Sequence, residues 1–242
     1  MTKEFKRQDG RKPDEFRKII AKVGVVPNAN GSAVFEFGGT KAIAAVYGPK
    51  EMHPQHSQNP EKGTLRVTYN MMSFSVHDRI KPGPSRRSME ISTVSGWALD
   101  PVVNLNKFPG KVVDVHIDIM QANASTRCAG INAASLALAH AGIPMSDLVS
   151  SVSIGKLDKQ LVVDVSKFEE DWEEGEGATD IAMSFTSAGE LTHIQLDGHI
   201  SVKELKEAIH LGKKKTKEIY EIQKKVLKDS IKLGEEEWKE KD

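Results

Sequence analysis

Hydrophobic and polar residues alternate along several stretches of the chain, with the period of two that is typical of half-buried strands. The alternation is most regular in residues 65–71 and 112–120, where branched and aromatic side chains take one face and mainly polar or charged side chains the other. Shorter apolar segments bounded by Gly, Asn or Asp predict further strands. Together the predicted strands are 19–26, 33–37, 41–47, 65–71, 112–120, 149–157, 161–165, 180–186 and 191–196.

Helical spacing replaces alternation in three places. A helix is expected over residues 86–105, behind a serine that can cap it, and a second over the Ala-rich segment 129–141. A third, long helix is expected from Ser201, where Ser201 and Glu204 form a capping box and hydrophobic residues recur at near-helical spacing. Its lysines are expected to form a solvent-facing side.

The order of these elements is strands followed by helices, twice over. This order predicts an α+β fold in which sheets pack against helices, with an internally duplicated unit. A chain of 242 residues is long enough for a sizeable core. We expect a single domain over residues 1–242, with a short polar arm at about 1–15 and the long helix from about 201.

Composition narrows the class of protein without identifying it. Hydrophobic residues make up 38% and charged residues 28%, which indicates a globular chain, and the single Cys128 excludes an intrachain disulfide. No apolar run is long enough for a membrane span, and the N terminus is charged from Lys3 onward. These features predict a soluble, cytoplasmic protein.

The net charge is zero, so overall charge does not favour nucleic acid, but the charges are unevenly placed. The segment from Lys62 to Arg87 is mainly basic, and the segment from Glu169 to Asp180 carries only acidic charges. A basic and an acidic stretch in a neutral chain suggest a polyanionic substrate together with a metal or acid/base site.

The start of the Ala-rich helix is the strongest local candidate for a binding site. Free backbone N–H groups and the positive end of the helix dipole lie there, and Ser125, Thr126 and Arg127 add two hydroxyls and a guanidinium. Together they can receive an anion the size of phosphate. An ordinary capped helix with a solvated arginine is the alternative.

A second helix start also carries cations. Arg86 and Arg87 lie in the first turn of the predicted helix 86–105, where positive charge is normally disfavoured. A bound anion would remove this conflict. Alternatively, Glu90 could simply pair with Arg86 at a spacing of four residues.

Longer motifs carry a resemblance to a known family. They are Asp9–Lys12, Asn28–His56, LRVTYNMMSFS at 65–75, KPGPSRRSMEIS at 81–92 and ASTRCAGINAASLALAHAGIPMSDL at 124–148. In these segments, and over about residues 7–227, the chain resembles the RNase PH family, most closely the catalytic RNase PH-like subunits of archaeal exosomes.

The resemblance implies a fold, an assembly and a reaction. The fold would be a duplicated form of the second domain of ribosomal protein S5. Six subunits would form a ring that alternates this chain with a related, non-catalytic one, and RNA-binding cap proteins could join it. Single-stranded RNA would be degraded from its 3′ end by inorganic phosphate, releasing nucleoside 5′-diphosphates, and the reverse reaction would add 3′ tails.

The resemblance also assigns roles to basic and hydroxyl residues. Those that match phosphate-binding positions of the family, or lie beside them, are Arg87, Ser125, Thr126 and Arg127. Arg66 and Arg86 match arginines that hold the RNA backbone, and Lys111 lies next to Gly110, which stands where the family has an arginine.

The acidic residues match the family less well. The family has two aspartates six residues apart; here Asp180 opens a strand and Asp171 matches the earlier one, but nine residues separate them. Glu174 has the right spacing and a different side chain. An ungapped alignment would place Gly177 or Ala178 at the second position and imply a crippled enzyme.

The implied role of this acid pair leaves two possibilities open. Asp171 and Asp180 would hold Mg²⁺ or Mn²⁺, or an acid would protonate the departing 3′ oxygen. A catalytically weak ring subunit that scaffolds and threads RNA is an alternative function. A homohexameric RNase PH that trims tRNA 3′ ends is another, although the segments GPKEMHPQH and SRRSMEIS are more similar to the exosome subunit.

Overall fold

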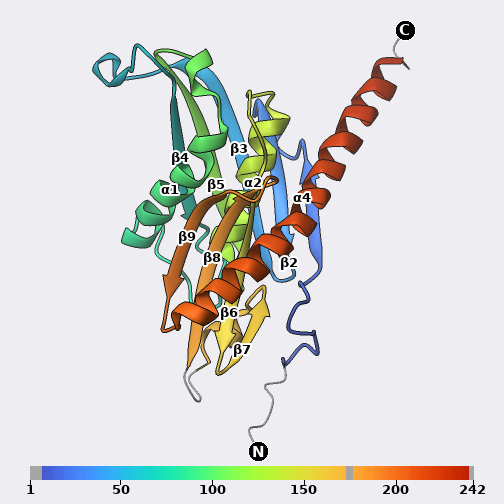
Figure 1. Ribbon diagram of the computed structural model, residues 1–242. Helices are drawn as coiled ribbons and strands as arrows, with labels where there is room; N and C mark the ends of the chain where they lie inside the picture. The colour runs from blue at the N-terminus through green and yellow to red at the C-terminus, as the bar shows by residue number, and fades with distance from the viewer. Residues whose placement is uncertain (1–6, 173–176, 240–242) are drawn as a thin grey trace, which may run out of the picture.

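The structure is a computed structural model and describes residues 7–172 and 177–239, with side chains up to Ile231 (Figure 1). Its described strands form two sheets. The five-stranded sheet has the order β1-β2-β3-β5-β4, and the four-stranded sheet has the order β7-β6-β8-β9. The prediction of an α+β fold with sheets packed against helices is confirmed.

The strands of the first sheet are β1 (Ile19–Val23), β2 (Gly31–Phe37), β3 (Thr40–Glu51), β4 (Thr64–Met71) and β5 (Lys111–Gln121). The first three form an antiparallel meander, with residues 24–30 joining β1 to β2 and a tight turn at Gly38 and Gly39 joining β2 to β3; β3 pairs antiparallel with β5. β4 and β5 run parallel, because helix α1 (Arg86–Leu99) carries the chain back between them.

The second sheet is antiparallel throughout and contains β6 (Val149–Leu157), β7 (Gln160–Val163), β8 (Ala178–Thr186) and β9 (Leu191–Asp197). The one-turn helix α3 (Lys167–Glu170) follows β7, and helix α4 (Val202–Lys239) closes the chain. Figure 1 shows α4 lying across the second sheet, with its C-terminal part extending beyond the strands. None of the helices in the described ranges has the length and apolar character needed to span a membrane.

Helix α2 (Thr126–His140) contacts strands of both sheets and lies in the middle of the core. Nearly half of its residues are Ala, Gly or Ser, so the neighbouring backbone comes very close: a Cβ on Gly31 would lie 2.3 Å from the Ala141 nitrogen. One continuous hydrophobic core runs through both sheets around this helix. The Ala-rich composition is therefore a packing requirement as well as a helix signal.

Three elements differ from the sequence prediction. The helix expected over 86–105 ends at Leu99, because Pro101 cannot continue it, and two short 3₁₀ turns follow (Asp100–Val102 and Leu105–Lys107). Helix α3 was not predicted; it forms behind Ser166, whose side chain makes a capping box with Glu169. A further 3₁₀ turn, Gln55–Ser57, lies in the loop between β3 and β4.

Candidate active site

A cleft of about 780 Å³ is lined by residues from both halves of the chain. The N terminus of α2 and Arg87 of α1 contribute one wall, and strands β8 and β9 with helix α3 contribute another. The charged and hydroxyl side chains that line it are His77, Asp78, Arg87, Ser125, Thr126, Arg127, Ser153, Lys167, Glu170, Asp180 and Asp197. Cations and carboxylates therefore face the same cleft.

The N terminus of α2 is open towards this cleft. Ser125 occupies the N-cap position, but its side chain makes no cap hydrogen bond; its Oγ lies 2.9 Å from the Ser153 Oγ and donates to the Val165 carbonyl at 3.0 Å. The first N–H groups of a helix have no partner within the helix. Because the serine is engaged elsewhere, these groups are left for an anion in the cleft.

The loop before α2 has an unusual backbone. Ala124 and Ser125 have φ angles of 54° and 53°, in the left-handed region that residues with a Cβ avoid. Each such residue costs about 1–2 kcal/mol and persists only where surrounding contacts fix it. This strain turns the chain sharply from β5 into α2 at the cleft wall.

Within the described residues, Arg127 makes one long ion pair and no close one. Its Nη2 lies 3.9 Å from the Glu90 Oε1, and its buried Nε has no hydrogen-bond partner in the described chain. Glu90 also accepts a hydrogen bond from the Gln195 Nε2 at 2.7 Å. Its partners are therefore Arg127 and Gln195, and not Arg86, which was the alternative expected from the sequence. Burial, with the nearby Arg127 charge, lowers the pKa of His193 to about 4, which keeps this imidazole neutral.

Asp180 faces Arg127 from strand β8. Burial, followed by the negative charge of Glu170, raises the pKa of Asp180 to about 6, although Arg127 acts in the opposite direction. Asp197 adds to the increase, since β9 places it opposite Asp180 in the strand register. The Oδ1 atom of Asp180 is buried and accepts no hydrogen bond from the described residues. This carboxyl can hold a proton near neutral pH and can present an oxygen to a ligand.

The structure thus brings together five residues that the sequence singled out: Arg87, Ser125, Thr126, Arg127 and Asp180. Asp171 does not line the cleft; its carboxylate accepts from the Lys167 Nζ at 2.7 Å. Because successive residues on a helical turn point in different directions, Glu170 faces the cleft in its place. Glu174 lies outside the described residues, and a catalytic role for it or for Asp171 stays a prediction.

The three residues expected to hold RNA lie outside this cleft. Arg86 is exposed in the first turn of α1, and Lys111 is exposed at the start of β5. Arg66 donates to both oxygens of Asp114, at 2.6 and 2.8 Å. Their proposed contact with RNA is therefore with nucleotides outside the cleft.

Asp114 lies on the polar face of β5, which a half-buried strand would turn to solvent, and yet it is only 3% exposed. Burial opposes its ionisation, but Arg66 and the Lys50 ammonium at 2.7 Å hold the pKa of Asp114 below its usual value. The partners come from β3 and β4, which flank β5 in the sheet.

Sequence reasoning missed four charged residues of the cleft: Asp78, Lys167, Glu170 and Asp197. Glu170 directly precedes Asp171, and only the orientation of α3 distinguishes them. Asp197 ends an alternating strand, and pairing that strand with β8 would have placed it beside Asp180. Lys167 follows Ser166, which caps α3, and lies just before the acidic segment that begins at Glu169.

Carboxylate oxygens in the cleft suit a hard cation, but the described residues include no group of three His, Cys, Asp or Glu side chains that could hold a metal ion. Mg²⁺ often takes only one or two protein carboxylates and completes its shell with water and substrate phosphates. Asp180, whose Oδ1 has no partner among the described residues, and Glu170 or Asp197 therefore fit Mg²⁺ when a phosphate ligand is present.

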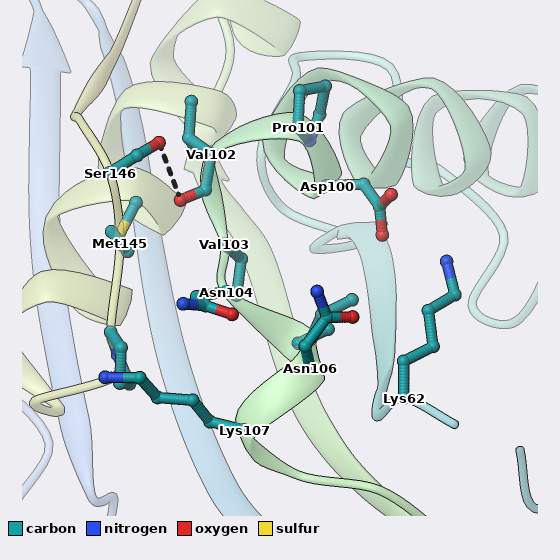
Figure 2. A pocket seen from close by; sticks show the side chains of 12 residues that line it. Lys62, Asp100, Pro101, Val102, Val103, Asn104, Asn106, Lys107, Met145 and Ser146 are labelled. Carbon is teal, nitrogen blue, oxygen red and sulfur yellow. Dashed lines mark hydrogen bonds between the residues drawn. The ribbon is translucent and has the colours of Figure 1, made fainter. Parts of the chain in front are cut away.

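A second hollow, of about 480 Å³, lies at the C-terminal end of α1 (Figure 2). Lys62, Asp100, Asn106 and Lys107 point into it or along its rim, and Ser146 donates a hydrogen bond to the Val102 carbonyl at 3.3 Å. It is lined by neither an arginine nor the start of a long helix. It therefore lacks the features that suit the first cleft to phosphate.

Comparisons with known proteins agree with this geometry. Residues 15–144 match the model of the 3′ exoribonuclease family, domain 1, and residues 147–215 match domain 2. The chain is 49% identical to the exosome complex component Rrp41 of Pyrococcus furiosus over 232 residues, which cover 96% of this chain and 92% of that protein. It is 45% identical to Rrp41 of Methanopyrus kandleri, with 92% of each protein covered.

Solved structures show the same fold. Rice Rrp46 superposes with a TM-score of 0.80 at 24% identity, covering 91% of this chain and 100% of that one. A chain of the Archaeoglobus fulgidus exosome, solved with RNA bound to the active site, gives a TM-score of 0.78 at 24% identity, covering 89% and 92%.

Proposed function

Because the chain belongs to the RNase PH family of 3′ exoribonucleases, we propose that it is the phosphorolytic subunit of an archaeal-type exosome core. It degrades single-stranded RNA from the 3′ end with inorganic phosphate and releases nucleoside 5′-diphosphates; in reverse it adds 3′ tails. One observation carries this proposal: Arg87, Arg127 and the open N terminus of α2 share a cleft with Asp180, whose pKa is raised to about 6.

Phosphorolysis must bring two anions together, the attacking phosphate and the scissile phosphodiester. The backbone N–H groups at the start of α2 and the Thr126 hydroxyl bind the attacking phosphate, with Arg127 and Arg87 supplying positive charge. The same fixed charges stabilise the negative charge that develops in the transition state. Because they are positioned before substrate arrives, little reorganisation is needed during the reaction.

The departing 3′ oxygen needs a proton as its bond to phosphorus breaks. Asp180 supplies it, since a carboxyl with a pKa near 6 is partly protonated at neutral pH. In its ionised form Asp180, with Glu170 or Asp197, would instead hold Mg²⁺, which when bound neutralises charge on the substrate phosphates. Asp171, which the family resemblance selects and which lies outside the cleft lining, is a proposed additional acid.

The proposed partners follow from the relatives, which are named exosome components and match nearly the full length of the chain. A related non-catalytic subunit completes a six-membered ring, and RNA-binding cap proteins join it. Arg66, Arg86 and Lys111 hold the RNA strand beyond the cleft. The proposed location is the cytoplasm, where RNA and inorganic phosphate occur together.

The test is a degradation assay on single-stranded RNA with and without phosphate, using the chain alone and mixed with the related subunit. Phosphate-dependent release of nucleoside diphosphates supports the proposal. Phosphate-independent release of monophosphates, or no degradation by the mixed ring, contradicts it, and the latter favours the scaffold function. Gel filtration of the chain alone separates a homohexamer from a subunit that needs its partner.

A further inference from the structure

The strained loop 123–125 is tied to three distant segments of the chain. The Arg17 Nη1 donates to the Asn123 carbonyl at 2.6 Å. The Thr40 hydroxyl donates to the Ala124 carbonyl at 2.7 Å and accepts from the Asn123 N–H at 3.0 Å. The Lys167 backbone N–H donates to the Asn123 Oδ1 at 2.8 Å. We call these contacts, with Asp164, the loop-holding network.

Arg17 contacts both the loop and the Asp164 carboxylate. Its Nε and Nη2 donate to the two Asp164 oxygens at 2.8 and 2.6 Å, and its Nη1 reaches the loop. Asp164 also accepts from the Ser125 Oγ at 3.3 Å, so one buried carboxylate joins the arginine to the N-cap serine. The side chains of Arg17 and Asp164 are 8% and 2% exposed. The guanidinium is therefore fixed on both sides.

Neither Arg17 nor Asp164 lines the cleft. Their contacts instead fix the residues that direct α2 into it. With Ser125 held by Ser153, Asp164 and Val165, its hydroxyl cannot swing round to cap the helix. The first N–H groups of α2 stay open as a result.

We propose that Arg17, acting through Asp164 and the Asn123 carbonyl, is a positioning residue that holds loop 123–125 in its left-handed conformation and so presents the start of α2 to phosphate. This inference rests on the proposed function, because it takes inorganic phosphate as the ligand of that helix start. Arg17 itself touches neither phosphate nor RNA.

Arg17→Lys is the main test variant. Lysine keeps the charge beside Asp164, but a single ammonium cannot reproduce the fork that binds both carboxylate oxygens and the carbonyl together. We expect KM for phosphate, and Kd for phosphate measured by calorimetry, to rise about tenfold, the loss expected when the strain of one left-handed residue is no longer compensated. KM for RNA should stay within about twofold.

Arg11→Lys is the matched control. Arg11 lies six positions before Arg17, its side chain is similarly buried and it contacts Asp164 at 3.5 Å, but among the described residues it makes no hydrogen bond to loop 123–125. Its replacement should leave KM for phosphate within about twofold. Equal KM values for the two variants would overturn the inference, because both arginines would then act only on stability.

A rescue experiment distinguishes positioning from general stabilisation. Glycine adopts positive φ without steric cost, so in an Ala124→Gly background the loop needs less support. The effect of Arg17→Lys on KM for phosphate should there fall to about threefold or less. A full tenfold effect in the glycine background contradicts the proposed role of strain.

Thr40→Val provides a second variant if Arg17→Lys does not fold. It removes both Thr40 contacts to the loop without leaving a buried charge unpaired, and it should raise KM and Kd for phosphate in the same direction; no change would overturn the inference. Calorimetry needs no turnover, so the positioning role is tested even if the parent chain lacks activity. If the parent chain showed no phosphate-dependent degradation of RNA, that result would refute the proposed function instead.

Discussion

Replacing Asp180 with Asn tests the proposed general acid most directly. At pH 7 a carboxyl with a pKa of about 6 is protonated in about one molecule in ten, whereas with the ordinary value of 3.8 the fraction would be below about one in a thousand. Asparagine has nearly the same shape and cannot donate this proton to the 3′ oxygen. We expect kcat to fall by about 10²-fold or more, the range for a lost acid.

Binding should respond in the opposite direction from catalysis. Asp180 is a negative charge that faces Arg127, so its neutral replacement should leave the affinity for RNA and phosphate equal or higher. The pH profile provides a second measurement: kcat of the parent should decrease as pH rises through about 6, because the acid must be protonated, and this limb should disappear in Asp180→Asn.

The same substitution should stabilise the fold at neutral pH. The folded pKa of Asp180, about 6, lies above the ordinary 3.8, so the folded state binds the proton more tightly than the unfolded chain. Its contribution to stability is complete below about pH 3.8 and is lost as pH rises to about 6. The loss is about 3 kcal/mol, from about 1.4 kcal/mol per pKa unit. Denaturant unfolding at pH 5 and pH 7.5 measures whether Asn removes this pH dependence.

Asp118→Asn is the control, because Asp118 lies on β5, outside the cleft, and its one side-chain hydrogen bond within the described residues is from Asn70 at 3.4 Å. Its kcat should stay within about twofold of the parent. An Asp180→Asn enzyme that keeps more than about a tenth of the parent kcat, with an unchanged pH limb, would refute Asp180 as the acid.

Three further predictions concern the charged residues of the cleft and of the proposed RNA path. Arg127→Glu should abolish phosphate-dependent degradation while circular dichroism shows an intact fold, because a carboxylate at the start of α2 repels both anions; unchanged phosphorolysis would remove the phosphate assignment. Salt titrations of RNA binding should show a slope reduced by about 0.7 in Arg66→Ala and in Arg86→Ala, and curves that overlay the parent would make these arginines structural. Glu170→Gln removes a charge that raises the pKa of Asp180, so the descending limb of the kcat profile should move to lower pH; a limb that stays in place would mean that Glu170 does not influence the acid.

The sequence alone determined features that depend on neighbours in the chain. Alternation located the strands of both sheets, and the Ala-rich pattern located α2, because each signal spans only a few residues. The phosphate-binding candidates at 125–127 were visible for the same reason: they are contiguous, and the start of a helix creates its own anion site. The family resemblance then connected Arg87 and Asp180 to them.

Only the tertiary structure decided which distant side chains meet. The turn of α3 selected Glu170 rather than Asp171, and strand register placed Asp197 opposite Asp180. Asp114 is buried because β3 and β4 bring Lys50 and Arg66 to it from either side. Such contacts depend on the register and packing of elements far apart in the chain, so a local sequence pattern does not predict them.

The loop before α2 shows most clearly which features the sequence determines and which depend on the tertiary structure. Its sequence indicates a turn into a helix, but its left-handed Ala124 and Ser125 persist through Arg17, which is 106 positions from Asn123 in the chain. A strained backbone is stable only where the rest of the fold compensates for it. The residues that bind phosphate are therefore local in sequence, while the conformation that opens them to phosphate is a property of the whole tertiary structure.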